Sequence, residues 1–176
     1  MSRLGQLQSI VKDADELHIS AEMVNYSGVI EYYPEELVIT VKSGTVISEI
    51  QRVLSENGQS LPFYISNKND TIGKEYANGG QGLSDFVLGV QIIDGNGDLL
   101  NFGGQVMKNV AGYDVSRLLV GSKGKLAIIT QISFKVLPDS YIGEFNQPIK
   151  SSDQSTIRLQ IEKKLKEVFD PRGVFI

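Results

Sequence analysis

The chain has 176 residues, of which 41% are apolar and 22% charged, with a formal net charge of −4. This composition is typical of one compact globular domain, and the acidic balance disfavours a nucleic-acid partner. Because the chain contains no cysteine, it cannot hold a disulfide, a thiolate metal site or an iron–sulfur cluster, so redox chemistry here requires a bound organic cofactor. No apolar run approaches the ~18 residues of a membrane span, and the N-terminus lacks a signal peptide's apolar core, so we expect a cytoplasmic protein.

The first residues predict a short helix followed by a short strand. Apolar residues at helical spacing indicate an amphipathic helix over residues 3–14. Residues 16–20 are then expected to be extended. His18, the only histidine, alternates with two apolar neighbours, which favours a structural role over ligand chemistry.

A hairpin and a second helix are expected next. Two β-rich runs within residues 28–44 flank a turn at residues 34–36, which predicts antiparallel strands. Residues 45–58 place apolar side chains on one helical face, with Thr45 as the expected N-cap and Gly58 after the last turn.

The middle of the chain predicts a long loop and the clearest hairpin. Residues 59–65 are expected to be extended, and the polar, Gly-rich residues 66–84 are expected to form a loop. Residues 85–104 predict two strands around a tight connection, in which Gly95 and Gly97 supply positive φ.

The second half predicts a short helix near residues 115–119, a long alternating strand over residues 125–138 and a polar connection to residue 154. A C-terminal helix over residues 155–169 follows. Its expected apolar face is made by Ile157, Ile161, Leu165 and Val168. These elements predict an α+β fold with a mostly antiparallel sheet flanked by helices.

Residues 85–138 carry three motifs whose order and spacing are distinctive. They are D-F-V-L-G, then G-G-x-V-M-K-N-V-A-G-Y-D, and then G-S-x-G-x-L-x-I-I-T. This segment resembles the small FAD-binding subunits of bacterial glycolate oxidases, which belong to the flavoprotein superfamily of vanillyl-alcohol oxidase and p-cresol methylhydroxylase (PCMH). A weaker likeness covers residues 25–45 and the terminal F-D-P-R-G-V-F-I.

The resemblance implies a single shortened FAD-binding domain of the PCMH type over residues 1–176, with its core match at residues 85–138. It implies FAD, bound weakly or lost, and a role as a subunit of a glycolate (2-hydroxy acid) oxidoreductase complex. The implied partners are a larger flavoprotein subunit and an iron–sulfur subunit, with a homodimer as a further possibility. No catalytic residue and no metal ligand is expected in this chain.

Glycines and polar residues of these motifs are the candidate cofactor contacts, because glycine permits positive φ and close approach of the backbone to a ligand. For any one glycine, turn geometry alone is an alternative, as are solvation for the Lys and Asn of the central motif and helix capping for its Asp. The strand after the last motif is expected to bring main-chain groups to the flavin. The expected contacts are Gly79, Gly80, Lys108, Asn109, Gly112, Tyr113, Asp114, Gly121, Ser122, Gly124 and Ile128.

The chain also departs from the family pattern. No glycine lies between Gly5 and Gly28, where a loop that cradles the FAD pyrophosphate is expected, and the second glycine block is reduced to residues 78–82. The cap domain that follows Pro138 in full-length relatives is absent. A flavin-binding subunit that is not catalytic alone is therefore weighed against a flavin-free interaction protein and against an independent nucleotide-binding module.

Overall fold

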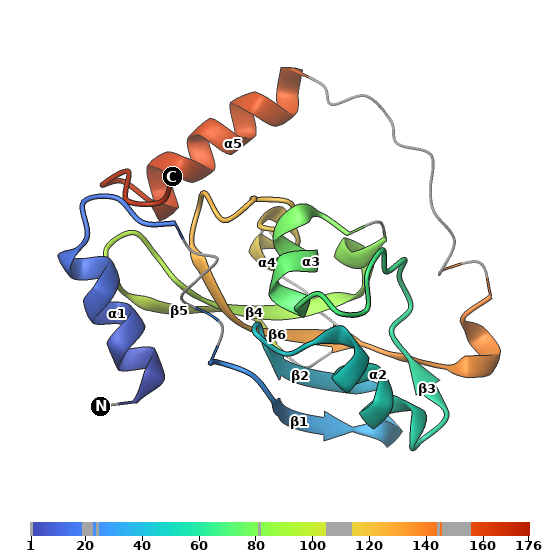
Figure 1. Ribbon diagram of the computed structural model, residues 1–176. Coiled ribbons are helices and arrows are strands. Elements are labelled where there is room, and N and C mark those ends of the chain that lie inside the picture. The colour runs from blue at the N-terminus through green and yellow to red at the C-terminus, as the bar shows by residue number, and fades with distance from the viewer. Residues whose placement is uncertain are drawn as a thin grey trace.

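A five-stranded antiparallel sheet forms the centre of the computed structural model, which describes residues 2–18, 23, 25–80, 82–104, 114–143, 145 and 156–176 (Figure 1). The strand order is β1-β2-β6-β4-β5. The strands are β1 Val29–Tyr33, β2 Val38–Lys42, β4 Val87–Ile93, β5 Leu99–Gly103 and β6 Ile128–Lys135. Every neighbouring pair is antiparallel, which confirms the predicted α+β fold and both predicted hairpins.

Helices and short elements surround this sheet. The helices are α1 Arg3–Asp13, α2 Ile47–Ser55, α3 Ile72–Asn78, α4 Val115–Leu118 and α5 Thr156–Phe169. Short 3₁₀ turns occupy Pro34–Glu36, Leu83–Phe86 and Asp139–Tyr141, and a two-stranded sheet pairs β3 Gln59–Ser60 with β7 Leu137–Pro138. Within the described ranges, no helix combines the length and apolar character that crossing a bilayer requires.

Two groups of buried side chains hold the elements together. The larger lies between the sheet and helices α2 and α3, and includes Ile50, Tyr76 and the tilted ring pair of Phe63 and Phe134, whose centroids are 5.4 Å apart. The smaller packs α1 and the C-terminal tail against the ends of β4 and β6. The burial of apolar area in the larger group is the main term that stabilises the fold, and it fixes α3 over the sheet.

The predicted N-cap of α2 is wrong. The helix begins at Ile47 after Val46, whose side chain makes no cap hydrogen bond. The hydroxyl of Thr45 instead donates to the carbonyl oxygen of Lys42 at 2.6 Å, because the chain turns sharply between β2 and the helix. Gly58 does follow the last turn with a φ of +62°.

Residues 66–84, predicted to be a loop, contain helix α3. The hydroxyl of Thr71 accepts the N–H of Lys74 at 3.3 Å and caps the helix start, and Gly79 ends it with a φ of +75°. The prediction was wrong because a helix this short offers too few apolar positions for its period to be recognised, although its cap residues have the expected types.

The predicted need for positive φ was wrong for one of the two turn glycines. Gly97 has the expected positive φ of +79°, whereas Gly95 does not adopt a positive φ. A Cβ at Gly95 would lie 2.3 Å from Oδ1 of Asp170, so the position needs glycine because the C-terminal tail passes close to its backbone.

The predicted strand over residues 125–138 and the predicted apolar face of α5 also differ from the structure. The strand is divided, because the N–H of Val136 pairs with the carbonyl oxygen of Leu37 and the chain then enters the smaller sheet. On α5, Leu165 packs against the larger group of buried side chains as predicted, whereas Ile161 and Val168 are 43% and 67% exposed. The side chain of Ile157 lies outside the described residues. The helix instead packs through the face that carries Phe169, which meets Phe102 edge to face at 5.7 Å.

The predicted strand over residues 16–20 is reduced to one parallel bridge. Leu17 pairs with Phe175 of the C-terminal tail, while residues 19 and 20 lie outside the described residues. This bridge joins the segment that follows α1 to the C-terminal tail.

Candidate functional site

A cavity of about 530 Å³ lies between the end of β2, helix α3 and the turn that leads into β6, and we call it the Ser43 cavity. Its lining combines apolar side chains with polar ones. Ala77, Ala127 and Ile129 are among the apolar ones, and Asn69, Thr71 and Lys74 are among the polar ones. A concave site with an apolar surface and a few polar groups is typical of small-molecule and cofactor sites.

Backbone hydrogen bonds fix the start of α3 against the end of β2. The N–H of Ser43 donates to the carbonyl oxygen of Thr130 on β6 at 2.9 Å, and its own carbonyl oxygen accepts the N–H of Gly73 at 2.8 Å. The N–H of Ile72 donates to the carbonyl oxygen of Thr45 at 2.9 Å. The cavity wall is therefore part of the rigid sheet-and-helix framework.

The other end of α3 is bound to the turn that carries the G-S-x-G motif. The N–H of Gly121 donates to the carbonyl oxygen of Tyr76 at 2.9 Å, and the N–H of Lys123 donates to that of Ala77 at 2.7 Å. A Cβ at Gly79 would lie 3.1 Å from the Cα of Gly121, so this approach depends on glycine. Two predicted site residues thus meet across this contact.

Tyr76 anchors α3 from inside the core. Burial raises the pKa of its hydroxyl far above the usual value, and the charge of Asp114 acts in the same direction. The hydroxyl donates to the carbonyl oxygen of Ser116, so Tyr76 is a neutral structural residue over the whole physiological pH range.

The other predicted residues have different positions. Gly124, with a φ of +73°, lines the Ser43 cavity. Asp114 caps α4 and pairs with Arg117 at 2.9 Å, which agrees with the capping alternative. The side chain of Ile128 packs in the smaller group of buried side chains, while its neighbours Ala127 and Ile129 line the cavity. Lys108, Asn109, Gly112 and Tyr113 lie outside the described residues, so their role stays a prediction.

Gly80 follows α3 directly and lies against Glu75. A Cβ at Gly80 would be 2.6 Å from Oε1 of Glu75, so a larger residue there would displace the end of that side chain. This contact does not test ligand binding.

Sequence reasoning missed Ser43 and Gly73. Ser43 is 2% exposed, and its Oγ has no hydrogen-bond partner among the described residues. A Cβ at Gly73 would lie 2.7 Å from the Cβ of Ser43, so the helix rests directly on the strand end. No local sequence pattern marks either residue, because their contact arises from the crossing of β2 and α3.

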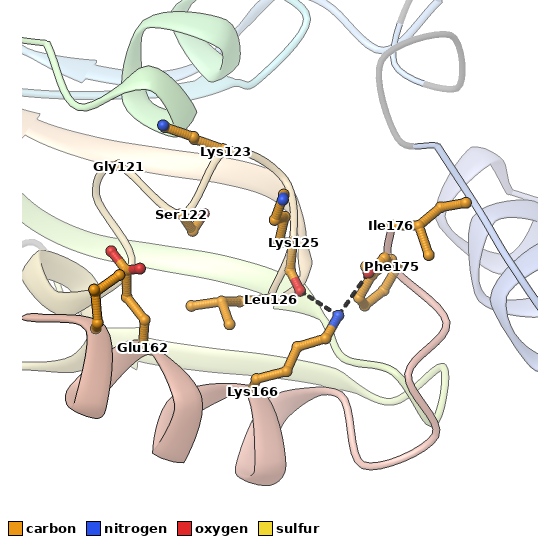
Figure 2. Close-up of a pocket in the computed structure, with 10 residues that line it drawn as sticks. Gly121, Ser122, Lys123, Lys125, Leu126, Glu162, Lys166, Phe175 and Ile176 are labelled. Atoms are coloured by element: carbon orange, nitrogen blue, oxygen red, sulfur yellow. Dashed lines mark hydrogen bonds between the residues drawn. The ribbon is translucent and has the colours of Figure 1, made fainter.

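A second cavity, of about 490 Å³, lies between the same turn and α5, and we call it the Lys166 cavity (Figure 2). Figure 2 shows Nζ of Lys166 directed between the carbonyl oxygens of Lys125 and Phe175, each at 2.6 Å. The same Nζ pairs with the buried carboxylate of Asp170. Ser122, a predicted contact, lines this cavity and not the Ser43 cavity.

The residues present fit an organic cofactor better than a metal ion. Among the described residues, no group of three or more His, Asp or Glu side chains is placed to hold a metal. The Ser43 cavity offers apolar side chains and the hydroxyl of Ser43, which has no partner among the described residues, and together these suit a planar ring with polar edges. This is the kind of group that a flavin nucleotide carries.

Glu75 on α3 predicts a pH-dependent stability. Burial raises the pKa of its carboxyl, and the charge of Asp70 raises it further, against a smaller opposing effect of Lys74. Below the unfolded-state pKa of about 4.3, the Glu75 carboxyl is protonated in both the folded and the unfolded state, so its burial costs no charge-related stability. As pH rises above it, the unfolded chain ionises more readily than the folded one, so stability falls until the folded-state pKa is passed.

We therefore expect Glu75→Gln to raise the melting temperature at pH 7, with a gain that shrinks as pH falls toward 4. Thermal unfolding followed by circular dichroism at pH 4, 5.5 and 7 measures it, and Glu56→Gln, at a site with 64% side-chain exposure, is the control. A gain in melting temperature that is independent of pH would show that the ionisation of Glu75 is not its cause.

Comparisons with known proteins show which family the chain belongs to. The chain is 47% identical over 127 residues to "Glycolate oxidase subunit GlcE" of Escherichia coli (strain K12), which covers 64% of this chain and 35% of the relative. It is 36% identical over 119 residues to "Glycolate oxidase subunit GlcD" of Bacillus subtilis (strain 168), covering 62% and 25%. It is 27% identical over 143 residues to "D-2-hydroxyglutarate dehydrogenase, mitochondrial" of Rattus norvegicus, covering 76% and 26%.

The chain thus spans about a third or less of the length of these curated relatives. The family model described as the FAD binding domain matches residues 4–103, which include β1, β2, α2, α3 and the β4–β5 hairpin. More than half of the chain falls within this match, which covers the β2 and α3 walls of the Ser43 cavity, whereas the residues that line the Lys166 cavity lie outside it. This chain belongs to the FAD-binding-domain family of PCMH-type flavoproteins.

Proposed function

We propose that the chain is a flavin-binding subunit of a glycolate-type (2-hydroxy acid) oxidoreductase complex, and that it does not turn over substrate alone. The observation that carries this proposal is that the turn with the G-S-x-G motif, on which the family resemblance rests, forms a wall of the Ser43 cavity through Gly124 and Ala127. FAD, when bound, supplies the two-electron acceptor that this chain's own side chains cannot supply.

The chain's residues have positioning roles in this proposal. Gly124 lets the backbone of the turn line the cavity, while Gly79 and Gly121 allow α3 and this turn to approach each other closely. Ala127 and Ile129 offer an apolar surface to a ring. The contacts proposed from the family pattern also include Gly80, Asp114, Ser122, Ile128 and, from the central motif, Lys108, Asn109, Gly112 and Tyr113. We propose that all of them belong to one PCMH-type domain over residues 1–176.

The described cavity lining offers little for binding or oxidising a 2-hydroxy acid. A carboxylate is held best by a bidentate arginine, and the described residues that line the Ser43 cavity include none. Of its two lysines, Lys74 pairs with Asp70 at 2.8 Å. The lone histidine, His18, has its Nδ1 3.1 Å from the carbonyl oxygen of Ile176. Substrate groups are therefore proposed to come from a larger flavoprotein subunit, with an iron–sulfur subunit as electron acceptor.

The test is flavin titration of the purified chain, followed by dye-linked oxidation of 2-hydroxy acids. We expect FAD to bind with micromolar or weaker affinity, because the shortened glycine loops remove charge-assisted hydrogen bonds of roughly 1.5–3 kcal/mol each. We expect no turnover by the chain alone and turnover after co-expression with the two larger subunits. Nanomolar FAD affinity, or turnover by the chain alone, would contradict this proposal.

Exposed apolar side chains favour a second candidate, a flavin-free interaction protein that stabilises a partner flavoprotein. Leu159 and Val168 on α5 are 61% and 67% exposed, and such side chains are stabilised by a protein contact. Protein that stays colourless after reconstitution with FAD, yet forms a heterocomplex or a homodimer in size-exclusion chromatography, would support this candidate over the first.

A further inference from the structure

The hydroxyl of Ser43 is a buried hydrogen-bonding group that the fold does not use. Its backbone N–H and carbonyl oxygen are both paired, to Thr130 and Gly73, while its Oγ has no partner among the described residues. Leaving a buried hydroxyl unpaired costs about 1–3 kcal/mol. A serine hydroxyl can donate one hydrogen bond and accept two, and all of this capacity is unspent.

The surroundings of Ser43 leave the cavity as the place where this capacity can be used. Helix α3 abuts the residue so closely that a Cβ at Gly73 would lie 2.7 Å from the Cβ of Ser43, yet no α3 atom pairs with the hydroxyl. Ser43 itself lines the Ser43 cavity. A ligand in this cavity can therefore supply the partner that the described residues do not provide.

The chemistry of the cavity indicates which part of a ligand this is. Ala77, Ala127 and Ile129 line it with apolar surface, which a flat ring covers and a phosphate does not. Two lysines also line the cavity: Lys74 pairs with Asp70 at 2.8 Å, and Lys123 lies on the turn that leads into β6. A neutral hydroxyl beside apolar side chains suits the carbonyl or nitrogen edge of a heteroaromatic ring.

We propose that the Ser43 hydroxyl is a positioning contact that hydrogen-bonds the polar edge of a heteroaromatic ring bound in the Ser43 cavity. This inference rests on the proposed flavin-binding function and assigns to it a side chain outside the family motifs. Because FAD carries two such rings, isoalloxazine and adenine, both sources are tested below.

The inference predicts opposite effects on stability and on binding. Ser43→Ala removes an unpaired buried hydroxyl, so the melting temperature of the ligand-free protein stays equal or rises. The same change removes a ligand contact, so the dissociation constant for FAD rises about 3- to 10-fold. A serine with a purely structural role would show the reverse, with lower stability and unchanged binding.

Ser133→Ala is the matched control, because Ser133 on β6 is half-buried and its Oγ lies 2.8 Å from Oγ1 of Thr40, outside the cavity lining. We expect this control to lower the melting temperature and to leave the FAD affinity unchanged. Equilibrium dialysis and thermal unfolding of the wild-type chain and both variants give the two readouts for each protein.

Riboflavin and ADP serve as ring probes in the same dialysis experiment. The probe whose affinity falls by the same factor in Ser43→Ala as that of FAD identifies the ring that Ser43 contacts. If the variant binds FAD as the wild type does, or if neither probe shows the loss, the inference fails while the proposed function stands. If the wild-type chain binds none of the three ligands, both fail.

Discussion

Replacing Lys166 by methionine is expected to lower the free energy of unfolding by about 3 kcal/mol, and the melting temperature by roughly 6–10 °C. The reason is the environment of Asp170, whose side chain is 0% exposed and pairs with Nζ of Lys166. Methionine keeps the apolar stem but leaves a buried carboxylate without its countercharge. The substitution also leaves the carbonyl oxygens of Lys125 and Phe175 without their donor.

Chemical denaturation measures this loss as a lower unfolding midpoint with an unchanged m-value. Lys163→Met on the exposed side of the same helix is the control and is expected to change stability by less than about 0.5 kcal/mol. The double variant Lys166→Met/Asp170→Asn is expected to recover part of the loss, because it removes the unpaired charge. Equal stabilities of Lys166→Met and Lys163→Met would show that the pair contributes nothing.

The Lys166 contacts belong to a larger role of the C-terminal tail in joining distant elements. The Asp170 carboxylate accepts the N–H groups of Val174 and Phe175 at 2.8 and 2.9 Å and so folds the tail back. The guanidinium of Arg172 donates to carbonyl oxygens at the end of α1 and in the β4–β5 turn, the shortest bond being 2.9 Å to Ala14. Because Nζ of Lys166 donates to the carbonyl oxygen of Lys125, this C-terminal region also holds the turn beside both cavities.

The elements that sequence reasoning predicted are those whose side chains repeat with a clear period. The β4–β5 hairpin was predictable from two β-rich runs around a glycine-containing turn, and α2 buries Ile47, Ile50 and Leu54 at helical spacing. The predicted apolar face of α5 was wrong at Ile161 and Val168, although Leu165 does pack on the core, because spacing alone cannot tell which apolar side chains meet the core. Phe169 packs there while Val168, one residue earlier, stays in solvent.

The candidate site was predictable only where a motif carries it. Gly121 and Gly124 were found through the G-S-x-G pattern, and both adopt positive φ in the turn beside the cavity. Ser43 and Gly73 could not be found in this way, because their importance arises from a crossing of β2 and α3 that no local pattern encodes. A single serine after a strand looks like any other turn residue until its hydroxyl is seen without a partner.

Replacing Gly79 by valine tests whether the contact between α3 and the cavity turn is needed for flavin binding. Gly79 has a φ of +75°, and a Cβ there would lie 3.1 Å from the Cα of Gly121. Valine is expected to lower the free energy of unfolding by about 2 kcal/mol because the backbone there is left-handed. It is expected to lower it by about 1–3 kcal/mol more because the side chain pushes the turn away from the helix. The same movement widens the Ser43 cavity, so the FAD affinity is expected to fall about tenfold or more.

Gly58→Val separates the two causes, because Gly58 also follows a helix, with a φ of +62°, but a Cβ there would have nothing within 4 Å. We expect this control to lower the free energy of unfolding by about 2 kcal/mol and to bind FAD as the wild type does. Denaturant titration and equilibrium dialysis of both variants give the comparison. Equal FAD affinities in the two variants, at temperatures where both are folded, would mean that the flavin does not depend on the α3 contact and that the binding surface lies elsewhere on the chain.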